Sequence, residues 1–177
     1  MPQVTLYILL INIKFKSSAM LDDIYNQKIL ELAGNIPAIG RLDACDATSK
    51  QHSKLCGSTV IVDLCAKKVD GDIIITDFAH DVKACALGQA SSSIMARNIN
   101  GASGQELKTL QNDMRAMLKD NGPAPQGRFG DYHYLEPVRQ YKARHASTML
   151  TIDAVVDCIN QIEQNAGADA VQKVTGT

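Results

Sequence analysis

The sequence predicts an α+β fold, in which a small antiparallel β-sheet is covered on one face by helices. A run rich in β-branched residues at 59–62 and an apolar run at 73–78 flank the dipeptide Asp70-Gly71. That dipeptide between two such runs is typical of a tight β-hairpin. Segments with apolar residues at helical spacing precede and follow the hairpin, and they supply the helical layer.

Composition and charge limit the classes of function. The chain has 177 residues, of which 45% are hydrophobic but only 5% aromatic, so we expect one domain with an aliphatic core. The net charge of -1, without a basic run, argues against a nucleic acid or an anionic membrane recognised through bulk charge. Five widely spaced cysteines without a CxxC pair favour reduced thiols and a cytoplasmic location.

The first 19 residues differ from the rest of the chain. An apolar run at 4–13 is too short to span a bilayer, which needs roughly 20 apolar residues. It also lacks the preceding basic region of a signal peptide. Residues 1–19 are interpreted either as an added edge strand or as residues read from an upstream start codon, with Met20 as the true start. The expected domain then covers 20–165, followed by a flexible tail at 166–177.

The first predicted helix covers residues 21–33, because apolar side chains recur there at helical spacing and Gly34 and Pro37 follow. Residues 36–53 have the composition of a loop. Cys45 lies in that loop and is interpreted as an incidental thiol. A third strand would come either from this loop or from the N-terminus.

The first strand of the predicted hairpin covers residues 58–69. Side chains alternate along a strand, so Val60, Val62 and Leu64 share the face on which Cys56 would lie. Cys65 then points to the opposite face and is expected to be structural.

Residues 83–93, KACALGQASSS, follow the return strand and open a helix of small residues. Cys85 would lie near the positive end of the helix dipole, which stabilises a thiolate, and Lys83 would add to this effect. A helix of small residues can also pack very close to a neighbouring element. Taken alone, Cys85 is equally a buried free thiol ahead of a packing helix.

A hairpin brings its two outer ends together. Cys56 precedes the hairpin and Cys85 follows it, so we expect the two thiols to be spatial neighbours. Two thiols at one end of a small sheet are typical of soft-metal or sulfur chemistry.

Three further segments complete the helical layer. Ser103 and Glu106 form a capping box that begins an amphipathic helix, which ends before Pro123. A loop at 123–130 and a weak helical piece at 131–141 follow. The last helix has apolar residues at helical spacing, with Ser147 or Thr148 as the expected N-cap and the buried Cys158 in its core face. His145 would precede that helix, and imidazole is a common ligand of zinc and iron.

These segments together resemble the iron–sulfur cluster assembly scaffolds of the IscU, SufU and NifU N-terminal type. The segment 83–93 is similar to that family's second-cysteine segment, and Leu55-Cys56-Gly57 is similar to its first. Residues 141–147 resemble the third-cysteine segment, and 123–138 resemble the insertion of the SufU branch. The resemblance implies a SufE/NifU-like α+β fold and a non-enzymatic role.

The chain departs from the family pattern at two positions. Ser58 replaces the family's aspartate, and the third cysteine is absent, with Ser147 or Ala146 in its place. The resemblance therefore implies Cys56 and Cys85 as ligands of iron or a transient iron–sulfur cluster. His145 is a candidate substitute ligand, and Lys83, Ser58 and Ser147 are candidate supporting residues.

Three functions compete. The first is a scaffold or carrier that works with a cysteine desulfurase, other assembly proteins and apo-protein acceptors. The second is a zinc-binding sulfur carrier or regulator of the same fold, and the third is a degenerate interaction module without metal. A conventional hydrolase or oxidoreductase is not favoured, because the chain has neither a glycine-rich phosphate loop nor a GxSxG motif.

Overall fold

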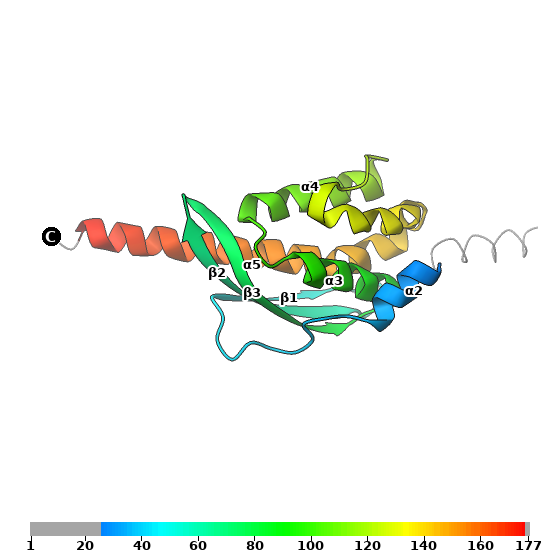
Figure 1. Cartoon of the computed structure of the whole chain (residues 1–177), viewed down its shortest axis with the longest axis horizontal. Helices are drawn as coiled ribbons and strands as arrows, with labels where there is room; N and C mark the ends of the chain where they lie inside the picture. Colours follow the sequence, from blue (N-terminus) through cyan, green and yellow to red (C-terminus); the bar gives the residue numbers. More distant parts are fainter. Residues whose placement is uncertain (1–25, 176–177) are drawn as a thin grey trace, which may run out of the picture.

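A computed structural model describes residues 26–175, and in them a three-stranded antiparallel sheet of order β1-β2-β3 lies against a helical layer (Figure 1). The predicted α+β class is confirmed. The predicted extension at 1–19 and the beginning of the first predicted helix lie outside the described residues. The elements in chain order are α2 (Gln27–Gly34), β1 (Ala47–His52), β2 (Thr59–Val69), β3 (Asp72–Lys83), α3 (Ala86–Asn98), α4 (Gly104–Lys119), the 3-10 helix η1 (Gly127–Gln140) and α5 (Lys142–Thr175).

The predicted hairpin is formed by β2 and β3. Its turn residues Asp70 and Gly71 have φ values of 50° and 91°, the left-handed conformation that a two-residue hairpin turn of type I′ needs. Strand β3 continues beyond the predicted end at Phe78 to Lys83. It does so because pairing with β2 persists to the register pair Thr59 and Lys83.

The third strand comes from the loop segment at 36–53, which is one of the two sources that the sequence offered for it. In β1, Ala47 and Ser49 are buried and Thr48 and Lys50 are exposed, so the strand has the alternation of a half-buried sheet. Its buried side chains are small and partly polar, which is why the hydrophobic pattern did not predict a strand. They lie against α5, which packs directly on β1.

The opposite face of the sheet is covered by the loop before β1. Backbone pairing of Gly40 with His80 (2.9 Å) attaches the loop to β3, and Arg41 then binds the buried carboxylate of Asp63 on β2. Hydrogen bonding to the Arg41 guanidinium holds the pKa of Asp63 low, at about 2. Cys65 also lies on this face and donates to the carbonyl of Ala44 (3.2 Å), so the predicted direction of its side chain is confirmed.

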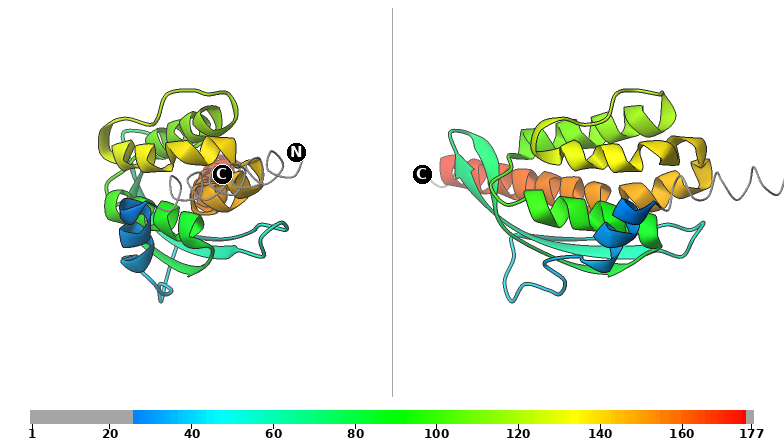
Figure 2. Two further views of the ribbon diagram at one scale, coloured as in Figure 1. Left: turned by 90° about the vertical axis from the view of Figure 1, so that its right-hand side faces the viewer. Right: turned by 45° about the vertical axis from the view of Figure 1, so that its right-hand side comes forward.

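The helices form two layers above the other face of the sheet. Figure 2 shows α3 and α5 next to the sheet and α4 and η1 beyond them, and α5 contacts β1, β2, α3 and α4. Helix α3 lies very close to α5, since a Cβ at Gly88 would be 3.0 Å from the carbonyl oxygen of Ser147. The hydroxyl of Ser91 donates across this interface to Thr148 O (2.7 Å). The predicted close approach of the small-residue helix is confirmed.

The beginning of the last helix was predicted wrongly. Helix α5 begins at Lys142, directly after η1, and not after an N-cap at Ser147 or Thr148. Both hydroxyls donate to the carbonyl of Arg144 (3.0 Å each), one turn earlier in the same helix. At its other end the helix continues through the expected tail to Thr175.

The remaining boundaries lie near the predicted ones. Ser103 caps α4 as expected, because its hydroxyl accepts from the backbone N–H of Glu106 (3.1 Å). The weak helical piece is the 3-10 helix η1, which begins earlier than expected, at Gly127. Cys158 is fully buried between α5 and the sheet, as expected for a core residue.

Candidate functional site

Three elements meet at the end of the sheet where α5 begins. The turn between β1 and β2 carries Cys56, the start of α3 carries Cys85, and the second turn of α5 carries Ser147. Backbone pairing of Ser53 with Ser58 (2.9 Å) closes the β1–β2 turn, and Gly57 takes a left-handed φ of 70° within it. The turn therefore holds Cys56 over the start of β2.

The two cysteines share their hydrogen-bond partners. The Cys56 thiol donates to the hydroxyl of Ser58 (3.0 Å), and the same hydroxyl accepts from the backbone N–H of Cys85 (3.4 Å). The Cys85 thiol donates to the hydroxyl of Ser147 (Sγ to Oγ 3.5 Å). The hairpin thus brings both thiols to one small area, as its topology predicted, while their role as ligands stays a prediction.

The Cys56 thiol has a lowered pKa. Burial raises its pKa, but the polar surroundings formed by Ser53, Ser58 and Ser147, of which Ser58 is in hydrogen-bond contact with the thiol, outweigh burial and lower the pKa to about 7. A large fraction of Cys56 is therefore thiolate at neutral pH, and the thiolate is the form that attacks electrophiles and binds metals. Ser53 was not singled out from the sequence, because its position depends on how the β1–β2 turn closes.

Cys85 lies where the sequence placed it. It is the N-cap of α3, with extended backbone angles (φ -65°, ψ 166°), and its side chain makes no capping hydrogen bond. The thiol is half-buried and is not used to satisfy the N–H groups of the helix. It remains available to a ligand beside the positive end of the helix dipole.

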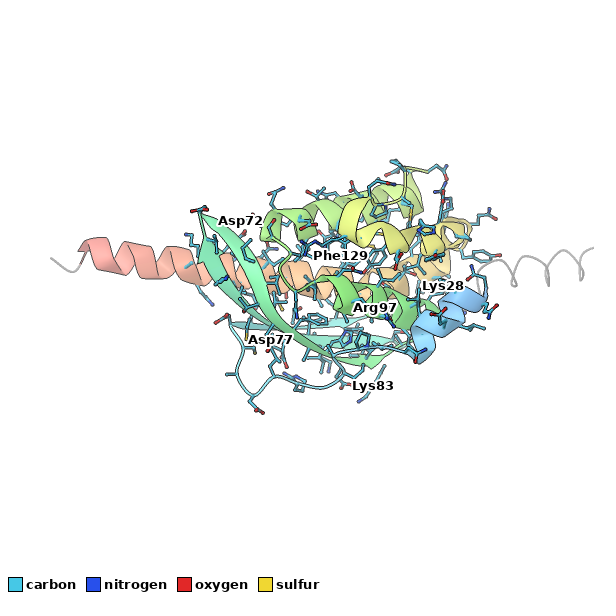
Figure 3. The ribbon with its side chains drawn as sticks, in the orientation of Figure 1. Lys28, Asp72, Asp77, Lys83, Arg97 and Phe129 are labelled. Carbon is cyan, nitrogen blue, oxygen red and sulfur yellow. The ribbon has the colours of Figure 1, made fainter. Side chains whose placement is uncertain are left out.

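Lys83 lies apart from the two thiols. Its side chain is 79% exposed, and its ammonium group is 3.8 Å from the carboxylate of Asp81. Figure 3 shows Lys83 at the end of β3, directed away from the helical layers. Lys83 was expected to stabilise the Cys85 thiolate, but its ammonium group pairs with Asp81 instead.

His145 is not brought to the cysteines. It lies in the first turn of α5, almost fully buried, and its Nε2 donates to the carbonyls of Val138 (3.2 Å) and Arg139 (3.1 Å). Its contacts thus connect the end of η1 to α5. Within residues 26–175, no group of three or more His, Cys, Asp or Glu side chains is close enough together to hold a metal ion.

Ser147 occupies the third corner of the site. The sequence left Ser147 and Ala146 as alternatives for the missing third cysteine. The Ser147 side chain is buried against the thiols, whereas Ala146 is exposed and lines a groove. The site therefore offers two thiols and a set of serine hydroxyls from Ser53, Ser58 and Ser147. Such a site suits a soft metal ion or cluster that is bound through sulfur and keeps some of its coordination positions open.

This fold, with two cysteines at one end of its sheet, is that of the NifU-like N-terminal domain. The family model of that description matches residues 24–148, and the chain belongs to this family. The sequence resemblance to this class of scaffold is confirmed. A search of curated proteins found no match.

Solved structures show the same relationship. A NifU-like protein (N-terminal) from Brucella abortus is 64% identical, with a TM-score of 0.77 over 82% of this chain and 98% of the other. A putative iron–sulfur cluster assembly scaffold protein for the SUF system from Fervidobacterium islandicum AW-1 is 20% identical, with a TM-score of 0.68 over 78% and 98%. A third structure, described as a hypothetical protein, is 22% identical, with a TM-score of 0.66 over 78% and 98%. The last two show the shared fold alone.

Among the described residues, no helix has the length and apolar character needed to cross a membrane.

Proposed function

We propose that this protein is a scaffold or carrier in iron–sulfur cluster assembly, and that Cys56 and Cys85 hold iron or a transient cluster as cargo. Membership in the NifU-like family supports the scaffold role. The proposed role is to hold and pass on cargo, without catalytic turnover of its own.

The observation that carries the proposal is the convergence of two half-buried thiols on Ser58 and Ser147, with the pKa of Cys56 at about 7. Thiolate sulfur is the ligand preferred by iron–sulfur clusters and by zinc. Two thiolates leave the other coordination positions to sulfide, solvent or a partner's side chain. The site would therefore hold cargo less tightly than a site with four protein ligands, which suits transfer to an acceptor.

The absence of a third cysteine defines the route of sulfur. Sulfur supplied by a cysteine desulfurase would have to be received on Cys56 or Cys85, and we assign this step to Cys56, because its pKa of about 7 makes it partly thiolate at neutral pH. In this step the Cys56 thiolate attacks the outer sulfur of the desulfurase persulfide. A new S–S bond forms on Cys56, and the desulfurase cysteine leaves as a thiolate. Apo-proteins would then accept the assembled cluster.

Anaerobic reconstitution tests the proposal. The purified apo-protein is incubated with ferrous iron and sulfide, and the visible absorbance of a cluster is recorded. The wild-type protein should develop the chromophore, and the double variant Cys56→Ala and Cys85→Ala should not. Cys65→Ala is the matched control, because Cys65 lies on the opposite face of the sheet and should not change the spectrum. No chromophore in the wild type, or an unchanged one in the double variant, would refute the cluster-binding role.

A zinc-holding sulfur carrier on the same two thiols is the second candidate. Two thiolates with open coordination positions also suit zinc, whereas the serines that stand in place of an acidic ligand and a third cysteine favour an interaction module without metal. Metal and acid-labile sulfide analysis after anaerobic purification separates the candidates. Stoichiometric zinc without sulfide or cluster transfer would indicate the carrier. Metal at background level, with partner binding that survives loss of both cysteines, would indicate an interaction module without metal.

A further inference from the structure

A basic groove lies at the end of the molecule where α5 begins. The C-terminal part of α4, the end of η1 and the first turns of α5 enclose a volume of about 1010 Å³. The charged residues of its lining are Arg115, Lys119, Arg139, Lys142 and Asp153. Four side chains of this set are lysine or arginine and one is acidic, although the whole chain has a net charge of -1. Positive charge is therefore concentrated in this groove.

Only part of this charge is neutralised within the protein. Arg115 pairs with Asp153 (2.9 Å), and Arg139 pairs with Glu136 (2.5 Å) at the edge of the groove. Lys119 and Lys142 pair with no carboxylate in the described part of the chain. The lining of the groove thus keeps a positive charge from these two lysines.

The start of α5 increases the positive potential of the groove. Lys142 is the first residue of the helix, and its first turn contains no acidic residue. The N-terminal end of a helix has a partial positive charge, so a cation there is unfavourable and an anion is favourable. A negatively charged partner in the groove would relieve this unfavourable arrangement.

We propose that this basic groove docks an acidic polypeptide segment of a partner protein. Its volume is far larger than a single small anion fills, and three elements line it. Leu118, Ala146 and Met149 give it an apolar lining that would receive an aliphatic side chain between the acidic ones. An acidic segment with interspersed leucines has the matching charge and apolarity.

The groove and the thiol site lie on two sides of the start of α5. Ala146 faces the groove, and the next residue, Ser147, contacts the Cys85 thiol. A partner docked here would therefore lie beside the thiol site. The use of this docking to deliver or receive cargo rests on the proposed function, whereas the docking itself does not.

The test is binding of a fluorescein-labelled synthetic peptide of alternating glutamate and leucine, followed by fluorescence anisotropy. The wild-type protein should bind it saturably at low ionic strength, and added salt should weaken binding. Lys119→Glu with Lys142→Glu should lower the affinity by about tenfold or more. Lys67→Glu with Lys68→Glu is the matched control, because it makes the same change in net charge at exposed positions of the hairpin. This control should change the affinity by less than about twofold.

Several outcomes would overturn the docking proposal. They are no saturable binding, equal loss in both double variants, and equal binding of a peptide with glutamine in place of glutamate. Displacement of the peptide by inorganic phosphate at equimolar concentration would instead indicate a site for a free anion. Circular dichroism confirms that each variant is folded. The variant Cys56→Ser with Cys85→Ser should bind the peptide like the wild type, so failure of the cargo role and failure of docking are distinguishable.

Discussion

At the scale of single residues, the cysteines differ in their surroundings and therefore in their chemistry. Hydrogen bonds from neighbouring serines lower the pKa of Cys56 to about 7 despite its partial burial. Burial, with the carboxylate of Asp46 close by, raises the pKa of Cys65, and burial raises that of Cys158 to about 12. Cys56 is thus partly thiolate at neutral pH, whereas Cys65 and Cys158 remain protonated.

The reactivity of Cys56 should follow this difference. Its rate of alkylation by iodoacetamide, measured by mass spectrometry, should rise with an inflection near pH 7, because only the thiolate reacts. Ser58→Ala removes one stabilising hydrogen bond, so the inflection should move to higher pH and the rate at pH 7 should fall several-fold. Cys65 in the same sample is the internal control and should react more slowly. Equal rates for Cys56 and Cys65, or no effect of Ser58→Ala, would contradict this account.

The sequence pointed to the two thiols of the candidate site, and for its third position it gave Ser147 with Ala146 as the alternative. Cys56 and Cys85 followed from strand alternation and from the hairpin turn, which are local signals. The choice between Ser147 and Ala146 depends on the rotational phase of α5. That phase could not be derived, because the helix was expected to begin after these residues, whereas it begins at Lys142.

At the scale of elements, the close contact of α3 with α5 positions the site. A Cβ at Gly88 would lie 2.8 Å from the Ala84 Cβ and 3.0 Å from the Ser147 carbonyl oxygen, so only glycine fits there. Ser92 adds a buried hydrogen bond to Thr151 across the same interface. This contact fixes the distance between the helix that carries Cys85 and the helix that carries Ser147.

Gly88→Ala should therefore affect both stability and the site. The extra methyl group forces α3 and α5 apart, and overpacking of this kind costs about 1–3 kcal/mol in the free energy of unfolding, measured by urea denaturation. Because Ser147 moves away from the thiols, alkylation of Cys56 at pH 7 should also slow. Gly34→Ala is the control, since a Cβ added there, at the end of α2, would have no atom within 4 Å. Equal stability of the two variants would show that the interface can relax.

The elements were predictable where one pattern determined them. The hairpin, the start of α3 and the cap of α4 each have a strong local signal, and all three are confirmed. Strand β1 was expected only as one of two alternatives and could not be located, because its buried positions are Ala47 and Ser49, whose small side chains meet α5 rather than a broad apolar surface. A strand of this kind is defined by its neighbours, which the sequence alone does not reveal.

At the scale of the whole molecule, the thiol site borders an extended aliphatic core, against which Cys85 packs. The buried aliphatic cluster extends from α2 through the sheet to α5, and it includes Leu64, Ile94 and Ile159, all fully buried. Cys56 and Cys85 lie at the edge of this core and are half-buried. The protein therefore has an apolar core of its own, and we expect cargo to add to a structure that is already formed.

Metal should stabilise the protein without being needed for folding. The apo-protein should unfold cooperatively on heating, and zinc or ferrous iron added anaerobically should raise its Tm by a few degrees, because a ligand that binds only the folded state stabilises it. The shift should vanish in Cys56→Ser with Cys85→Ser and persist in Cys65→Ser. An apo-protein without a thermal transition would show that the metal is part of the fold.

The edges of the sheet have a consequence for self-association. An exposed strand edge can pair with a strand of another chain and begin aggregation. The outer edge of β3 is bridged at two points, by Ile39 to His80 and by Ser103 to Ile74. The other edge is β1, a short and largely polar strand with an exposed Lys50. Edge-to-edge growth is therefore opposed on both sides, so the protein can keep half-buried reactive thiols accessible while its sheet resists aggregation.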